Sequence, residues 1–192
     1  MTSFLKSYVL MIVICTFLVE CELDKELEQR LNSYLNHTYH CFYFYERLAA
    51  HFSRSDRALF GFSDYFRRAA SEELNRAHIL VDMINKRDGK VNLYQDGGES
   101  GFVSKELDAS QALEQVAAKV HKAATELNQL YQSAYAAKDV YVQNKLFQFV
   151  KDHVEAMNNL KALEARLCRE NKHVEFLLDQ ELRGSPLLQK WM

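Results

Sequence analysis

The chain is poor in the residues that make turns, with only six glycines and one proline among its 192 residues. Sheets, propellers and doubly wound nucleotide-binding folds need many turns, and turns use Gly and Pro. This composition therefore favours an all-α protein. An excess of basic charge is also missing, because 24 Lys and Arg stand against 26 Asp and Glu. No basic excess exists to neutralise phosphates, so we expect no nucleic-acid partner.

Long apolar runs are missing as well. The N-terminal run from Tyr8 to Val19 is broken only by Thr16, and at about 12 residues it is shorter than the roughly 20 that span a bilayer. Lys6 precedes this run and Glu20 follows it, which is the pattern of a secretory signal. We predict a signal peptide over residues 1–21, a bundle domain over 22–192, a secreted or secretory-lumen location and no membrane span. The alternatives are the start of a buried helix or an uncleaved interfacial anchor.

Cysteines are few, and two of the four fall in or at the edge of the predicted signal. Cys41 and Cys168 belong to the mature chain. A secreted protein meets an oxidising compartment, so these two form a candidate disulfide. The alternative is a pair of buried thiols, which is common in helical cores.

What the chain does have is long amphipathic stretches. Apolar residues recur in steps of three, four and seven, which is the spacing of one helical face. The stretches run from Asp24 to Phe52, from Leu59 to Ile84, from about Asp108 to Ala137 and from about Val140 to Asn171. A short fifth helix is predicted over Val174–Leu182. Each long helix has about 30 residues and is therefore near 45 Å long.

The connections between these stretches predict the topology. Short links join the first helix to the second and the third to the fourth, so each pair is antiparallel. The polar link 53–56 can cap the second helix, which ends at residues 86–89 with basic residues and a Gly. Residues 88–107, about 20 in number, reach about 66 Å when extended at roughly 3.3 Å each. We therefore expect the second and third helices to be parallel, with one long crossover between them.

Several segments of the chain resemble the subunits of eukaryotic ferritins. The second helix matches at Phe62-Ser63-Asp64-Tyr65-Phe66 and Ser71-Glu72-Glu73, and its exit matches at Asn85-Lys86-Arg87-Asp88-Gly89-Lys90-Val91. Further matches are Tyr43-Phe44-Tyr45, Phe52-Ser53-Arg54-Ser55-Asp56, Gln95-Asp96 and Val174-Glu175-Phe176-Leu177-Leu178-Asp179. The resemblance covers roughly residues 24–183. It implies a ferritin-like four-helix bundle and a shell of 24 subunits that stores ferric mineral.

The resemblance also locates the positions of a ferroxidase centre, which holds two irons with carboxylates and a Glu-x-x-His pair. Glu72 and Glu73 match the paired acids of the second helix, and Tyr45 matches the tyrosine of the first. Fe²⁺ prefers carboxylate and imidazole ligands, and a guanidinium cannot coordinate it. The remaining ligand positions fall on Thr38, Arg76, Ala156 and either His121 or Lys122. We therefore expect no enzyme activity from this chain alone.

The apolar stripe places Glu73 and Arg76 inside the bundle, where residues three apart on one helix can pair. The alternative is an exposed surface pair. An Arg at the metal site resembles the light-chain type of ferritin, which implies that a heavy-type partner oxidises the iron. The other functions considered are a secreted helical bundle without an iron role, either signalling or structural, and a ferroxidase with atypical ligands.

Two further features of ferritins are altered in this sequence. Of the acids that help mineral to nucleate, only Asp64 and Glu72 remain, and Arg67 and Arg68 dilute their field. At the positions of the acids that line the three-fold cation channels stand Leu146 and Phe149. We expect these two to form an apolar constriction that does not attract iron.

Two other motifs are candidates of a different kind. Glu170-x-x-His173 has metal-ligand spacing but stands alone near a helix end. Asn36-His37-Thr38 is a glycosylation sequon of the secretory pathway, although it lies on a predicted helix. The remaining histidines, including His40, His51 and His153, are expected to be packed or exposed side chains.

Overall fold

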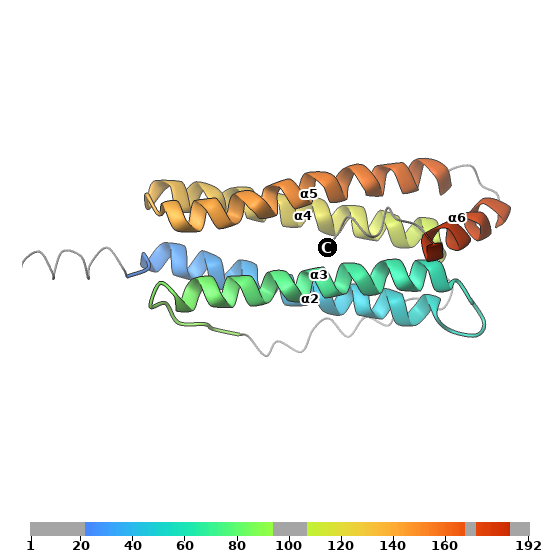
Figure 1. Ribbon diagram of the computed structural model, residues 1–192, viewed down its shortest axis with the longest axis horizontal. Helices are drawn as coiled ribbons and strands as arrows, with labels where there is room; N and C mark the ends of the chain where they lie inside the picture. The colour runs from blue at the N-terminus through green and yellow to red at the C-terminus, as the bar shows by residue number, and fades with distance from the viewer. Residues whose placement is uncertain (1–21, 94–106, 168–171, 185–192) are drawn as a thin grey trace, which may run out of the picture.

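The computed structural model describes residues 22–93, 107–167 and 172–184, and all regular structure in these ranges is helical. The helices are α2 (Lys25–Phe52), α3 (Phe60–Asn85), α4 (Ala109–Ala136), α5 (Val140–Leu167) and α6 (Lys172–Gly184). Four long helices lie side by side, and α6 packs at one end of them (Figure 1). The predicted all-α bundle with a short fifth helix is confirmed. The predicted signal peptide lies outside the described residues.

The direction of the helices also agrees with the sequence. α2 and α3 are antiparallel neighbours, as are α4 and α5. α3 and α4 run in the same direction, so the end of α3 and the start of α4 lie at opposite ends of the bundle (Figure 1). No helix in the described ranges is long and apolar enough to cross a membrane.

Three aspartates begin three of the long helices by accepting hydrogen bonds from free backbone N–H groups. The Oδ1 of Asp24 accepts from the N–H of Leu27 at 3.0 Å, and the Oδ1 of Asp139 accepts from that of Val142 at 3.0 Å. Asp108 forms a reciprocal capping box with Gln111. These caps explain why the helix starts follow so closely from the sequence.

The start of α3 differs from the expectation. The polar link 53–56 does not cap this helix, because Arg54 and Asp56 pair with each other at 2.8 Å and the N-cap residue is Leu59. The cap comes from α6 instead. The buried carboxylate of Asp179 accepts a hydrogen bond from the N–H of Phe62 at 3.0 Å. A residue 117 positions away thus satisfies the end of α3 and fixes α6 against it.

The other end of α3 is tied to the start of α5. Asp88, with φ of 55°, takes the left-handed conformation that the sequence suggested for Gly89, and the Gly89 N–H then donates to the Ile84 carbonyl at 3.0 Å. Arg87 pairs with the buried carboxylate of Asp139 at 2.8 Å. The Asp that caps α5 therefore also holds the end of α3.

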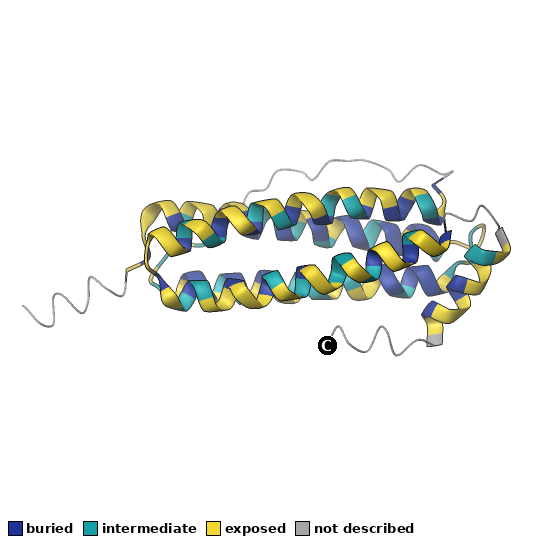
Figure 2. Ribbon diagram, turned by 90° about the horizontal axis from the view of Figure 1, so that it is seen from above, coloured by how far each residue is buried: buried dark blue, intermediate teal, exposed yellow. Residues whose placement is uncertain are grey.

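The apolar core is divided into two clusters along the bundle axis. One cluster contains Leu48, Phe52, Phe62 and Phe66 of α2 and α3 with the first half of α4. The other contains Leu27, Leu35 and Leu80 with the second half of α4 and the start of α5. Buried residues face inward along all four long helices (Figure 2). Between the clusters lies a short layer with buried polar side chains, formed by Thr38, Arg76 and His153.

Gly61 provides a test of the contact between α3 and α6. A Cβ at this position would lie 1.8 Å from the backbone carbonyl oxygen of Asp179, so Gly61→Ala should push α6 away. Without that clash, Ala in place of Gly would stabilise a helix by up to about 1 kcal/mol. We expect a lower melting temperature and faster amide exchange in α6. Gly89→Ala is the control, because its Cβ would first meet the flexible tips of Ile84 and Leu23 at 2.9 Å. An unchanged α6 in Gly61→Ala would contradict this packing.

Candidate functional site

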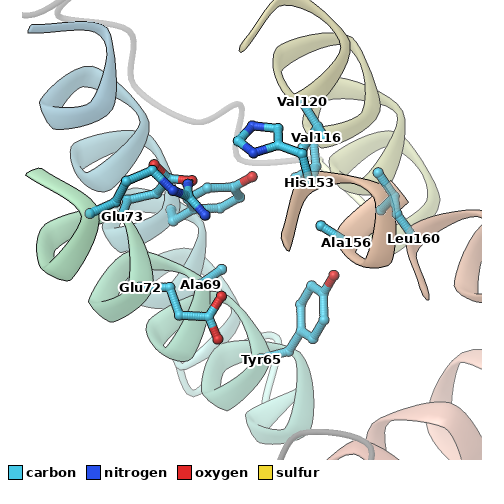
Figure 3. A pocket seen from close by; sticks show the side chains of 11 residues that line it. Tyr65, Ala69, Glu72, Glu73, Val116, Val120, His153, Ala156 and Leu160 are labelled. Atoms are coloured by element: carbon cyan, nitrogen blue, oxygen red, sulfur yellow. The ribbon is translucent and has the colours of Figure 1, made fainter. Parts of the chain in front are cut away.

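The polar layer surrounds a small cavity of about 40 Å³ in the middle of the bundle. This volume exceeds the roughly 10–15 Å³ that one water molecule needs. α3 contributes Glu72 and Glu73, and α5 contributes His153 and Ala156 from the facing side (Figure 3). The full lining is Tyr45, Tyr65, Ala69, Glu72, Glu73, Arg76, Val116, Val120, His153, Ala156 and Leu160.

An ion pair between Glu73 and Arg76 dominates this layer. The Oε1 of Glu73 and the Nη1 of Arg76 are 2.5 Å apart, and the two side chains are only 16% and 10% exposed. The guanidinium also lies 5.6 Å from the centre of the Phe149 ring. The pair is thus interior, as the apolar stripe predicts, and the exposed alternative is excluded.

The charges of this layer follow from burial and from Arg76. Burial acts to lower the pKa of Arg76, but the Glu73 carboxylate outweighs it, so the pKa is raised and the guanidinium stays charged. Burial raises the pKa of Glu72 to about 8, with Glu73 and Asp152 adding to the effect and Arg76 opposing it. Glu72 is therefore largely protonated at neutral pH, and the layer is close to neutral overall.

His153 faces the same cavity as a neutral imidazole. Burial, and then the charge of Arg76, lower its pKa to about 4. Its Nδ1 lies 3.1 Å from the carbonyl oxygen of Phe149, so this nitrogen carries the proton and donates it. The Nε2 then carries the lone pair. The sequence alone does not mark His153 as a site residue, although its place on the apolar stripe of α5 indicates an interior position.

The other positions that the resemblance marks as ferroxidase ligands offer little to a metal. Thr38 is 1% exposed and its hydroxyl donates to the Tyr34 carbonyl at 2.9 Å. Tyr45 and Ala156 line the cavity, and Ala156 has no ligand atom. Within the described ranges, no group of three or more His, Cys, Asp and Glu side chains is arranged to hold a metal ion.

On α4, neither of the two candidates for the remaining ligand position lies at the cavity. His121 and Lys122 are both exposed and neither lines the cavity. α4 instead presents Val116 and Val120, two apolar side chains one helical turn apart. The apolar stripe of this helix indicated that interior face, whereas the resemblance did not, because an alignment shift of one residue rotates a helix by about 100°.

The structure does not support the expected channel positions or the grouping of Asp64 with the acids of the cavity. Leu146 is fully buried and Phe149 is 4% exposed, both within the core of the single chain. Their side chains therefore cannot line a channel between subunits, and the exposed apolar residue of this segment is Phe147. Asp64 is half-buried and does not line the cavity with Glu72 and Glu73.

The glycosylation sequon is engaged in the fold. The Nδ2 of Asn36 donates to the carbonyl oxygens of Asn32 at 2.8 Å and Asn92 at 2.9 Å. A glycan would replace one of the two hydrogens on this nitrogen and remove at least one of these bonds, so the structure argues against its use. Cys41 is buried and has no disulfide partner among the residues that the structure describes. Its predicted partner Cys168 lies outside the described residues, as does Glu170 of the Glu-x-x-His motif, so both of those predictions remain untested.

Comparison with known proteins identifies the family. Residues 28–169 match the ferritin family model, described as a ferritin-like domain. The chain is 31% identical to "Ferritin-3, chloroplastic" of Arabidopsis thaliana, over 83% of this chain and 63% of that protein. It is 27% identical to "Ferritin, middle subunit" of Salmo salar, over 83% of this chain and 92% of that protein. The chain thus spans less than two thirds of the plant relative. It belongs to the ferritin family.

Proposed function

We propose that this chain is an iron-storage ferritin subunit of light type. In this proposal it holds ferric iron inside a shell of 24 subunits but has no ferroxidase centre of its own. A heavy-type partner chain supplies the oxidation of Fe²⁺. The observation that carries the proposal is the Glu73–Arg76 ion pair at the place where the resemblance puts the metal ligands.

The donor set around the cavity does not fit a pair of irons. Two irons need bridging carboxylates and several oxygen and nitrogen ligands. Glu73 already neutralises Arg76, and Glu72 is largely protonated near neutral pH. The side chains of Val116, Val120 and Ala156 supply no donor atom. A second cation beside the guanidinium would be repelled and would find little negative charge to offset its desolvation.

Arg76 instead supplies the positive charge that balances the buried carboxylate of this layer, without a metal ion. Its fixed positive charge neutralises Glu73 inside a low-dielectric interior, where an unpaired carboxylate would be costly. The ring of Phe149 packs on its guanidinium. An active chain would bind Fe²⁺ at this level of the bundle, and this chain has the Arg76 guanidinium there instead.

The acids left for mineral nucleation are also few. Asp64 and Glu72 do not meet in one cavity, and Arg67 and Arg68 are exposed beside them on α3. These features support a chain that contributes wall and storage space to a mixed shell. The N-terminal run from Tyr8 to Val19 supports a secreted or secretory-lumen location.

A second candidate is a ferroxidase with atypical ligands. It is favoured by one observation, the presence of Glu72, Glu73 and the Nε2 of His153 around one cavity. The kinetics of iron oxidation separate this candidate from the first.

The iron-oxidation prediction is tested on the purified, assembled chain by stopped-flow absorbance. We expect Fe²⁺ to be oxidised no faster than in buffer, while mixing with a heavy-type ferritin chain restores oxidation and retains the iron. Arg76→His should remain inactive, because Thr38 and Ala156 still lack ligands. Oxidation above the buffer rate by the parent or by Arg76→His would support the atypical ferroxidase instead.

The ion pair itself is tested by urea unfolding. Arg76→Leu leaves Glu73 buried without its cation and should cost about 3–5 kcal/mol, or less where Glu73 takes up a proton. Glu73→Gln combined with Arg76→Leu should recover much of this loss. The control is the exposed pair Glu26–Arg30, where Arg30→Leu should cost less than about 1 kcal/mol. A stability of Arg76→Leu equal to that of the parent would refute the role of the pair.

Glu72 predicts a pH dependence of stability. Its pKa is raised in the folded chain to about 8 from 4.5, so the folded state binds a proton that the unfolded state has lost. The protonated Glu72 therefore adds its full stabilisation of the folded state below about pH 4.5, and this stabilisation is lost as the pH rises to about 8. Glu72→Gln should therefore flatten the fall in stability between pH 5 and 8, measured as melting temperature against pH. Glu155→Gln, an exposed change on α5, is the control. Parallel curves for the parent and Glu72→Gln would contradict the raised pKa.

A further inference from the structure

A second cluster of reactive side chains lies where α2 meets α4, formed by Cys41, His37 and Glu126. The Nε2 of His37 is 3.3 Å from the Sγ of Cys41, one turn further along α2. The Nδ1 of His37 is 3.1 Å from the Oε2 of Glu126 on α4. The imidazole thus joins a thiol on one side to a carboxylate on the other.

The protonation state of His37 is fixed by these contacts. Burial, and then the charge of Lys122, lower its pKa to about 4, so the ring is neutral at pH 7. The carboxylate of Glu126 accepts the proton of Nδ1, which leaves the lone pair of Nε2 facing the thiol of Cys41. A histidine whose other ring nitrogen donates to a carboxylate has the arrangement that metal-ligating histidines show.

The distance between the two donor atoms suits an ion. A tetrahedral Zn²⁺ with a sulfur at about 2.3 Å and a nitrogen at about 2.0–2.1 Å holds them about 3.5 Å apart. The observed 3.3 Å between Sγ and Nε2 needs only a small rotation of either side chain to reach that value. We propose that Cys41 and His37 bind a thiophilic divalent ion of the Zn²⁺ class, with Glu126 orienting the imidazole.

Binding replaces the proton of the thiol. Cys41 releases one proton to water, its sulfur binds the ion as a thiolate, and no electron is transferred. Water fills the other coordination positions, because the described residues offer no third ligand in suitable geometry. Cys41 is 5% exposed and burial raises the pKa of its thiol to about 12, so the ion has to displace its proton and to reach the sulfur past His37 and Glu126, whose side chains are 15% and 32% exposed.

Three basic side chains, Arg76, Lys119 and Lys122, and two acidic ones, Glu73 and Glu126, face the pair, a net charge of +1. On α3, Glu73 is neutralised by Arg76. On α4, Lys122 lies 3.9 Å from Glu126, and Lys119 packs over the Phe44 ring at 4.8 Å. Tyr34 of α2 stacks on the ring of His37. Zn²⁺ and a thiolate together add one further positive charge, and the lysine nearest to Glu126, Lys122, is 70% exposed, so water screens its repulsion.

The test uses the reduced full chain, with its thiols counted, titrated with Co²⁺ alone in the absence of iron. A thiolate-to-cobalt charge-transfer band reports the sulfur ligand, and oxygen sites do not produce it. We expect one thiolate-bound Co²⁺ per chain, displaced by Zn²⁺. Cys41→Ser should abolish the band, while His37→Gln and Glu126→Gln should weaken binding at least tenfold. Cys168→Ser is the matched control and should bind as the parent does.

The absence of the band in the reduced parent, its persistence in Cys41→Ser or its loss in Cys168→Ser would each overturn the proposal. X-ray absorption of the Zn²⁺-loaded parent gives a second measurement that needs no variant at Cys41. It should show one sulfur and one imidazole nitrogen on zinc, and zinc with oxygen neighbours alone would refute the site. This result is independent of iron storage, because iron oxidation and retention are measured without Zn²⁺ or Co²⁺.

Discussion

The ion pair between Glu73 and Arg76 determines how the middle of this bundle is built. Two apolar clusters fill the ends of the core, and in the polar layer between them the Arg76 guanidinium neutralises the carboxylate of Glu73. The same positive charge helps to keep His153 neutral and opposes the rise in the pKa of Glu72. A metal ion in this layer would have to compete with a cation that is covalently part of the chain.

The helix ends then hold the four helices in register around that layer. Asp179 joins α6 to the start of α3, and Asp139 joins the start of α5 to Arg87 at the end of α3. Both are buried carboxylates that accept a backbone hydrogen bond and face an arginine, which is the condition under which a buried charge is tolerated. α3 is thus fixed at both ends, so its Glu73 and Arg76 face the interior.

Much of the fold follows from the sequence, because local signals and periodicity agree. Asp24 and Asp108 cap their helices as their positions suggest, and the length of residues 88–107 predicts that α3 and α4 are parallel. Long-range contacts were not predictable. Nothing local indicates that Asp179 caps α3, and the resemblance placed His121 or Lys122 at the cavity although the apolar stripe of α4 pointed to Val116 and Val120. The resemblance also misplaced Leu146 and Phe149, which lie in the core of the single chain. Glu73 and Arg76 could be paired from sequence because both lie on one helix, three residues apart.

The central claim is that Arg76 occupies the place of a metal in the bundle. Anomalous X-ray scattering at the iron edge, from crystals of the assembled chain soaked in Fe²⁺ without oxygen, tests it most directly. We expect no iron peak between Glu72, Glu73 and His153, and an Arg76 guanidinium still bound to Glu73. An ordered iron peak in that cavity, with Arg76 displaced from Glu73, would contradict the claim.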